Sequence, residues 1–93
     1  MDPTIVLDER IDVVVLFRAD GPGRLVAVPW KMKRGAREIV FRKLAMRHPT
    51  AQGRRMIHVF DMSDGVNDYR LEFDAERLTW RLVSMVEGCD GAT

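Results

Sequence analysis

Lysine and arginine side chains crowd into the middle of this 93-residue chain, and their spacing is the clearest indication of chemistry. Residues 31–58 carry nine of the fifteen Lys and Arg residues against one acid, Glu38, a net charge of +8. Residues 1–30 have a net charge of −2 and residues 59–93 a net charge of −5, so the whole chain is only +1. A phosphate backbone attracts clustered cations. The pattern therefore predicts a nucleic-acid-binding segment with RNA or DNA as the partner.

The candidate phosphate contacts form two groups, each beside an expected chain reversal. The first group surrounds a turn at residues 34–36 and the second flanks a loop at residues 49–53. In a meander such successive reversals lie at opposite ends of the sheet, which favours a stripe along one strand over a single patch. The candidates are Lys31, Lys33, Arg34 and Arg37 in the first group and Arg47, Arg54 and Arg55 in the second, with Arg42 and Lys43 nearby.

The same charge segregation also has a purely structural explanation. In an antiparallel sheet, a basic strand beside an acidic one forms cross-strand ion pairs, each worth roughly 0.2–1 kcal/mol. The segregation would then vanish in space, or leave a dipolar surface suited to a protein partner or to self-association through a strand edge. A protein-interaction module or homodimer is therefore the alternative. One contiguous basic field would favour nucleic acid, and interleaved signs would favour the alternative.

Catalytic and metal-binding patterns are weak. His48, His58 and Cys89 are the only histidines and cysteine, too few and too far apart for a zinc site. The acids around residues 61–68 lack the twelve-residue pattern of a calcium loop and suit Asx-turns better. The serines show no partner base, and no glycine-rich loop precedes a helix. We expect a non-catalytic binding module without metal, cofactor or small-molecule substrate.

Alternating apolar and polar residues predict that strands position these cations. A period of two runs through residues 56–62 and 69–74 and resumes from Leu78 to Leu82. Earlier strands are expected at residues 11–18 and 24–33, with Pro29 marking a bend or a sheet edge. Residues 1–9 are expected to be a flexible lead-in, residues 10–87 one domain, and residues 88–93 a disordered tail.

Residues 37–48 are ambiguous between strand and helix. Ala, Arg, Glu, Lys, Leu and Met favour a helix that Pro49 would end. The apolar residues give no clean helical stripe, however, and the centre at residues 39–41 is β-branched and aromatic. We therefore predict a bent or bulged strand.

Six strands joined by short turns predict an all-β fold. The expected architecture is a small antiparallel meander that curls into a bent sheet or small barrel. Its core would form around the aromatic side chains Trp30, Phe41, Phe60, Tyr69, Phe73 and Trp80. An exposed Trp30 or Tyr69 would suit RNA stacking, but a core position is the commoner use of such residues.

Three segments, "PWKMKRGAREIVF", "HVFDMSDGVNDYRLEF" and "LTWRL", resemble a loose group of small bacterial all-β proteins without assigned activity. The shared features are turn glycines and core aromatics, and Ala36 departs from the group's turn. The resemblance implies a β fold and nothing about chemistry.

Composition predicts the surroundings of the protein. The longest apolar run is Val13 to Phe17, far below the roughly 20 residues of a membrane span, and the N-terminal residues lack the pattern of a signal peptide. One cysteine cannot form an intrachain disulfide. We expect a cytoplasmic protein without membrane contact.

Overall fold

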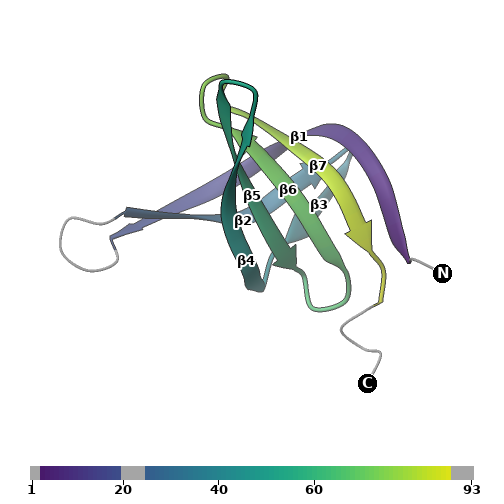
Figure 1. Ribbon diagram of the computed structural model, residues 1–93. Coiled ribbons are helices and arrows are strands. Elements are labelled where there is room, and N and C mark those ends of the chain that lie inside the picture. The colour runs from purple at the N-terminus through teal and green to yellow at the C-terminus, as the bar shows by residue number, and fades with distance from the viewer. Residues whose placement is uncertain (1–2, 20–24, 89–93) are drawn as a thin grey trace.

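The computed structural model describes residues 3–19 and 25–88, which form one antiparallel sheet (Figure 1). The strand order is β3-β2-β1-β7-β6-β5-β4. Apart from the β1–β7 pairing, every pairing joins strands that are consecutive along the chain, as in a meander, but the consecutive strands β3 and β4 are the two edges and do not pair. The sheet curls around its core without closing into a barrel. The strands are β1 (Thr4–Ala19), β2 (Leu25–Arg34), β3 (Arg37–Val40), β4 (Lys43–Gln52), β5 (Arg55–Ser63), β6 (Asp68–Asp74) and β7 (Thr79–Val86).

The sheet has seven strands where the sequence predicted six, because residues 37–48 form two strands instead of one. The strand prediction for this segment is confirmed, and the bend falls at Phe41 and Arg42. The Phe41 amide donates to the Trp30 carbonyl over 2.8 Å, and the Arg42 amide donates to the Ser63 carbonyl over 2.7 Å. Two consecutive residues thus bond to opposite halves of the sheet, and the chain passes directly from edge strand β3 to edge strand β4.

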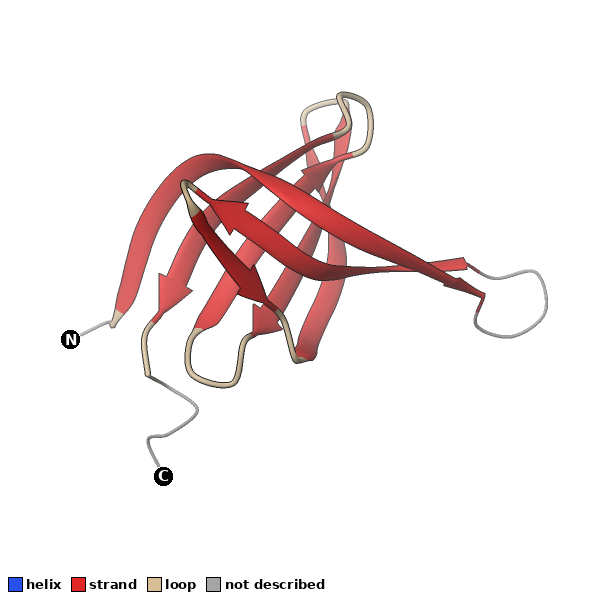
Figure 2. Ribbon diagram, turned by 180° about the vertical axis from the view of Figure 1, so that it is seen from behind, coloured by secondary structure: helices blue, strands red, loops and turns tan. Residues whose placement is uncertain are grey.

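Strand β1 bends between two partners. Its residues up to Ile11 pair with β7, and its residues from Asp12 onward pair with β2. This change of partner curls the sheet, and the far ends of β1 and β2 project from the body as a two-stranded arm (Figures 1 and 2). The segment Thr4–Glu9, which we expected to be a flexible lead-in, forms the first half of β1 and pairs with β7.

Strand β4 is longer than expected. Residues 49–52, predicted to be loop, continue the strand, and the reversal needs only Gly53 and Arg54 between the paired residues Gln52 and Arg55. Gly53 has a φ of 64°, a left-handed conformation that glycine adopts without steric cost. Pro49 fits within the strand because β4 is at a sheet edge, where a missing N–H need not break a ladder.

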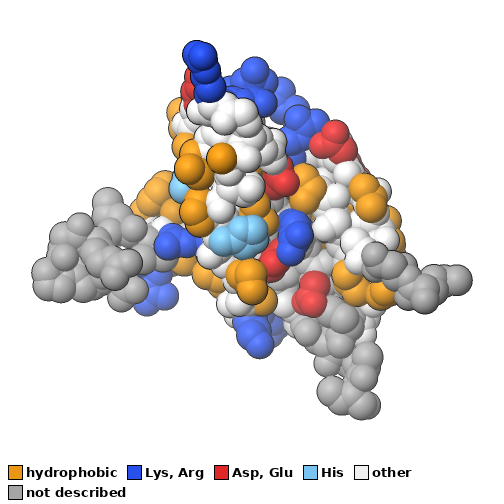
Figure 3. All heavy atoms as spheres, in the orientation of Figure 1, with side chains coloured by type: hydrophobic (Ala, Val, Ile, Leu, Met, Phe, Trp, Pro, Cys, Tyr) orange, Lys and Arg blue, Asp and Glu red, His pale blue; other side chains and the backbone are white. Residues whose placement is uncertain are grey.

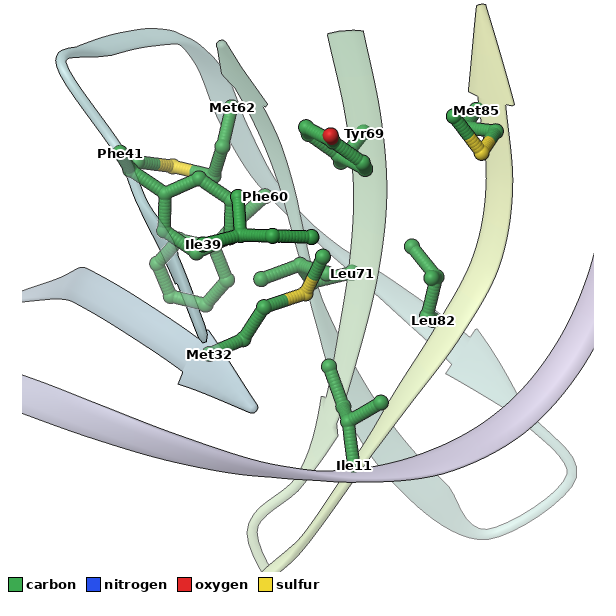
Figure 4. Packing of buried hydrophobic residues seen from close by; sticks show 10 residues of the cluster. All are labelled: Ile11, Met32, Ile39, Phe41, Phe60, Met62, Tyr69, Leu71, Leu82 and Met85. Carbon is green, nitrogen blue, oxygen red and sulfur yellow. The ribbon is translucent and has the colours of Figure 1, made fainter. Parts of the chain in front are cut away.

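The core lies inside the curl, between the two halves of the sheet (Figure 4). It contains Ile11, Met32, Ile39, Phe41, Phe60, Met62, Tyr69, Leu71, Leu82 and Met85. Phe73 and Trp80, predicted core residues, are half-buried and pack against it. The prediction for Trp30 is wrong, because this side chain is 52% exposed. Lys31 pairs with Val14 and Pro29 with Val15, which leaves Trp30 as the extra residue of a bulge.

The ends of the chain bear on two further predictions. The proposed tail lies outside the described residues except for Gly88, whose amide donates to the Asn67 side-chain oxygen over 2.9 Å. Residues 20–24 also lie outside them. The described residues include no helix long and apolar enough to cross a membrane.

Candidate nucleic-acid interface

The fold separates the seven predicted phosphate-binding residues into two hairpins. Lys31, Lys33, Arg34 and Arg37 lie on the β2/β3 hairpin, and Arg47, Arg54 and Arg55 lie on the β4/β5 hairpin. These hairpins occupy opposite ends of the strand order. The seven cations therefore belong to two hairpins that do not pair with each other.

Acids neutralise much of the β2/β3 hairpin. The Arg34 guanidinium donates two hydrogen bonds to the Glu9 carboxylate, over 3.1 and 2.9 Å, and this contact raises the pKa of Arg34. Lys31 forms an ion pair with Glu38 at 3.4 Å. Lys33 lies directly opposite Glu38 on β3 and Asp12 on β1. Positive and negative side chains are thus interleaved on this hairpin.

Arg55 is also committed to an ion pair within the fold. Its guanidinium donates to the Asp74 carboxylate over 2.9 Å. Asp74 in turn accepts the amides of Glu76 and Arg77, which shapes the β6/β7 turn. Burial raises the pKa of Asp74, but the two amides and the Arg55 charge outweigh it, so the pKa lies below the ordinary value.

Four cations remain available on β4 or directly beside it, two within the strand and one beyond each of its ends. We call Arg42, Lys43, Arg47 and Arg54 the β4 stripe; all four are exposed, and none forms an ion pair with any residue that the structure describes. Strand β4 itself, KLAMRHPTAQ, contains no acid. Lys33 and Arg37 on the β2/β3 hairpin are also exposed and form no ion pair with a described residue, but Lys33 lies opposite Asp12 and Glu38. The β4 stripe is therefore the larger group of unpaired cations, and no acid interrupts its strand.

The acid closest in register to the β4 stripe is already neutralised. Asp61 on β5 lies opposite Met46 of β4, and it accepts two hydrogen bonds from the Arg70 guanidinium, over 2.8 and 3.1 Å. The surface over the outer strands accordingly mixes both signs, while positive side chains gather at the end with the β4/β5 turn (Figure 3).

The β4 stripe follows an open sheet edge. Ten residues of β4 extend about 30 Å at the usual rise per residue. Arg47 lies opposite the core residue Phe60, whereas Lys43 lies opposite Ser63, which belongs to the other face. Arg47 and Lys43 thus flank the edge from opposite faces of the sheet.

Local structure fixes the start of the stripe. The Arg42 backbone is held by its hydrogen bond to Ser63, and its side chain passes beside Gly65. A Cβ atom at Gly65 would approach the Arg42 Cδ atom to 3.2 Å, and Gly65 has a φ of 98°. Glycine at this position therefore gives the Arg42 side chain room against the β5/β6 turn.

The acids around residues 61–68 organise a turn, as the sequence indicated. The Asp64 carboxylate accepts the amides of Val66 and Asn67, over 2.8 and 2.7 Å, and the Tyr69 hydroxyl over 3.0 Å. Burial raises the pKa of Asp64, but these hydrogen bonds outweigh it and place the pKa below its usual value. No group of three potential metal ligands occurs among the described residues.

Two surface features were not found by sequence reasoning. A row of half-buried rings, His58, Phe73 and Trp80, crosses three strands, and Leu16 and Phe17 are exposed on the arm. The alternating pattern placed His58 and the two aromatic residues on strands, but only the register shows that they adjoin.

Compared with known protein families, curated proteins and solved structures, the chain matches none of them. Only the fold class that the resemblance implied is supported: the protein is a small antiparallel all-β protein.

Proposed function

We propose that the protein binds nucleic acid along the β4 edge, with the β4 stripe in contact with backbone phosphates. One observation carries the proposal: four exposed cations follow a single edge strand that contains no acid. Lys and Arg side chains in such a row release counterions when they meet phosphates, and this release drives binding without sequence preference.

The proposal narrows the site predicted from sequence. Lys31, Arg34 and Arg55 are removed from it because each already neutralises an acid of the fold. Lys33 and Arg37 are left out because they lie on the other hairpin, where Lys33 faces Asp12 and Glu38. Arg42 and Lys43 join Arg47 and Arg54 because they share the edge. The small number of contacts implies weak binding with a salt dependence in proportion to that number.

The test is fluorescence anisotropy with labelled RNA and DNA of about 12 nucleotides, at about 50 mM salt. Arg47→Glu with Arg54→Glu should abolish binding. The matched control is Lys33→Glu with Arg37→Glu, which changes the net charge equally on the opposite edge and should retain binding. Equal loss in both variants would show that only the overall charge matters. Absence of binding by the unmodified protein would refute the proposal.

A second candidate function is protein interaction or self-association through the arm. The exposed fractions are 50% for Leu16, 67% for Phe17 and 52% for Trp30, which is unusual for neighbouring large apolar side chains. A shallow apolar hollow at the base of the arm is lined by Leu16, Trp30 and the core residue Phe41. Light scattering coupled to size-exclusion chromatography tests it: a dimer that Phe17→Ser converts to a monomer would favour this function, and a monomeric wild type would exclude the homodimer.

A further inference from the structure

Three aromatic rings form one row on the core-facing side of the sheet. His58 lies opposite Phe73, and Phe73 opposite Trp80, with ring centroids 6.4 and 4.7 Å apart. Directly opposite residues share a face of a sheet, and Phe60, two residues from His58, is a core residue. The row therefore continues the core toward the β4/β5 turn, beyond the part that the other half of the sheet covers. All three residues are half-buried, so each is partly exposed to solvent.

Open space adjoins the Trp80 end of this row. A hollow of about 430 Å³ lies where β1 leaves β7, and Arg10, Asp12, Val13, Leu78 and Trp80 are among its lining residues. The β1 residues up to Ile11 pair with β7 and those from Asp12 onward pair with β2, so the sheet opens at this point. The opening gives a planar ligand access to the row.

A cation stands at the β4 end of the row. Arg47 of the β4 stripe lies opposite Phe60 and therefore on the same face as the rings. Arg10 also lines the hollow at the other end, but it lies opposite Arg81 of β7 and therefore on the other face of the sheet. The one acid in the hollow, Asp12, lies opposite Lys33. Strand spacings put His58 about 5 Å and Trp80 about 14 Å from β4. Groups stacked on these rings are thus within reach of a chain whose phosphates contact the β4 stripe.

We propose that His58, Phe73 and Trp80 form a base-stacking platform, so that the ligand of the β4 edge is a single-stranded nucleic acid. This inference rests on the proposed function and adds the part of the ligand that is recognised. Aromatic side chains on adjacent strands stack bases of any sequence, because every base has a π face. A duplex keeps its bases stacked on one another and cannot offer them to these rings, so it should bind through its phosphates alone.

The test follows Trp80 fluorescence during binding. The chain has two tryptophans, and Trp30→Phe leaves Trp80 as the only one without changing the core. This variant is titrated with a thymidine oligonucleotide and with an abasic oligonucleotide of equal length and charge. We expect the thymidine strand to quench Trp80 and to bind more tightly, by roughly 5- to 140-fold for each stacked base. The abasic strand should bind weakly without quenching.

A matched pair of histidine variants provides the control. His58→Ala should weaken binding of the thymidine strand but leave the abasic strand unaffected. His48→Ala should change neither, because His48 lies opposite Val59 on the other face of the sheet. Equal binding of the two strands with unchanged Trp80 emission would overturn the stacking platform while phosphate binding stands. If neither strand bound, the proposed function itself would fail.

Discussion

The number of phosphates that contact the β4 stripe can be read from the salt dependence of binding. With four cations engaged, the slope of log K against log salt for a single strand should be about −2.8. A rise in salt from about 50 to 200 mM should then weaken binding by about 50-fold. Arg47→Gln with Arg54→Gln leaves two contacts, which predicts a slope of about −1.4 and a loss of only about sevenfold over the same range.

The assay is anisotropy titration at five or more salt concentrations, with Lys33→Gln and Arg37→Gln as the matched control. The control removes the same charge from the opposite edge of the sheet, where Lys33 faces Asp12 and Glu38, so its slope should remain near −2.8. If both double variants reduced the slope equally, the phosphate contacts would not belong to the β4 stripe. A wild-type slope much steeper than about −2.8 would mean that cations already paired in the fold also reach phosphate.

Three further predictions concern the fold. Leu71 is fully buried in the core, so Leu71→Ala should lower the free energy of unfolding by about 2–5 kcal/mol. Urea denaturation measures this loss, and a loss under about 1 kcal/mol would contradict the buried position. Leu78 is 73% exposed and has a φ of 56°. Leu78→Gly should remove about 1–2 kcal/mol of left-handed backbone strain, and the greater entropy of glycine in the unfolded chain should offset about 0.5–1 kcal/mol of that gain. Thermal unfolding should show a small gain, and a loss would reveal packing by this side chain. The pKa of Asp64 is lowered by folding, so its charge stabilises the protein above the unfolded value of 3.8, and this contribution is lost as the pH falls through the folded pKa. Asp64→Asn should therefore be less stable than wild type at pH 7, and equal stabilities at that pH would show that the charge contributes nothing.

Local patterns in the sequence predicted most of the strands. The alternation through residues 56–62 and 69–74 identified β5 and β6, and a β-branched, aromatic centre correctly favoured a strand over a helix at residues 37–48. The Asx-turn at Asp64 was predicted as well, because a side chain that bonds amides two and three residues onward is a local feature.

Predictions that depended on register were less successful. The period of two places Trp30 on the same face as the buried Met32, yet a bulge opposite Val14 and Val15 leaves Trp30 exposed. The loop expected at residues 49–53 is mostly strand, because pairing with β5 extends β4 to Gln52. Neither the bulge nor the pairing has a signal within a few residues of the sequence.

The candidate site shows the same division. Sequence identified the basic segment, but the partners that remove cations from it are distant: Glu9 lies 25 residues from Arg34, and Asp74 lies 19 residues from Arg55. Only the strand order shows that β4 is an edge strand and that the β4/β5 hairpin does not pair with the β2/β3 hairpin.

The sequence by itself determined that this chain forms antiparallel strands with a basic middle, because side-chain alternation and turn preferences are properties of a few adjacent residues. The tertiary structure alone decided which charges are neutralised, which rings adjoin and which edge stays open. Those outcomes depend on which strands become neighbours, and that choice is made by the burial of the whole apolar surface at once.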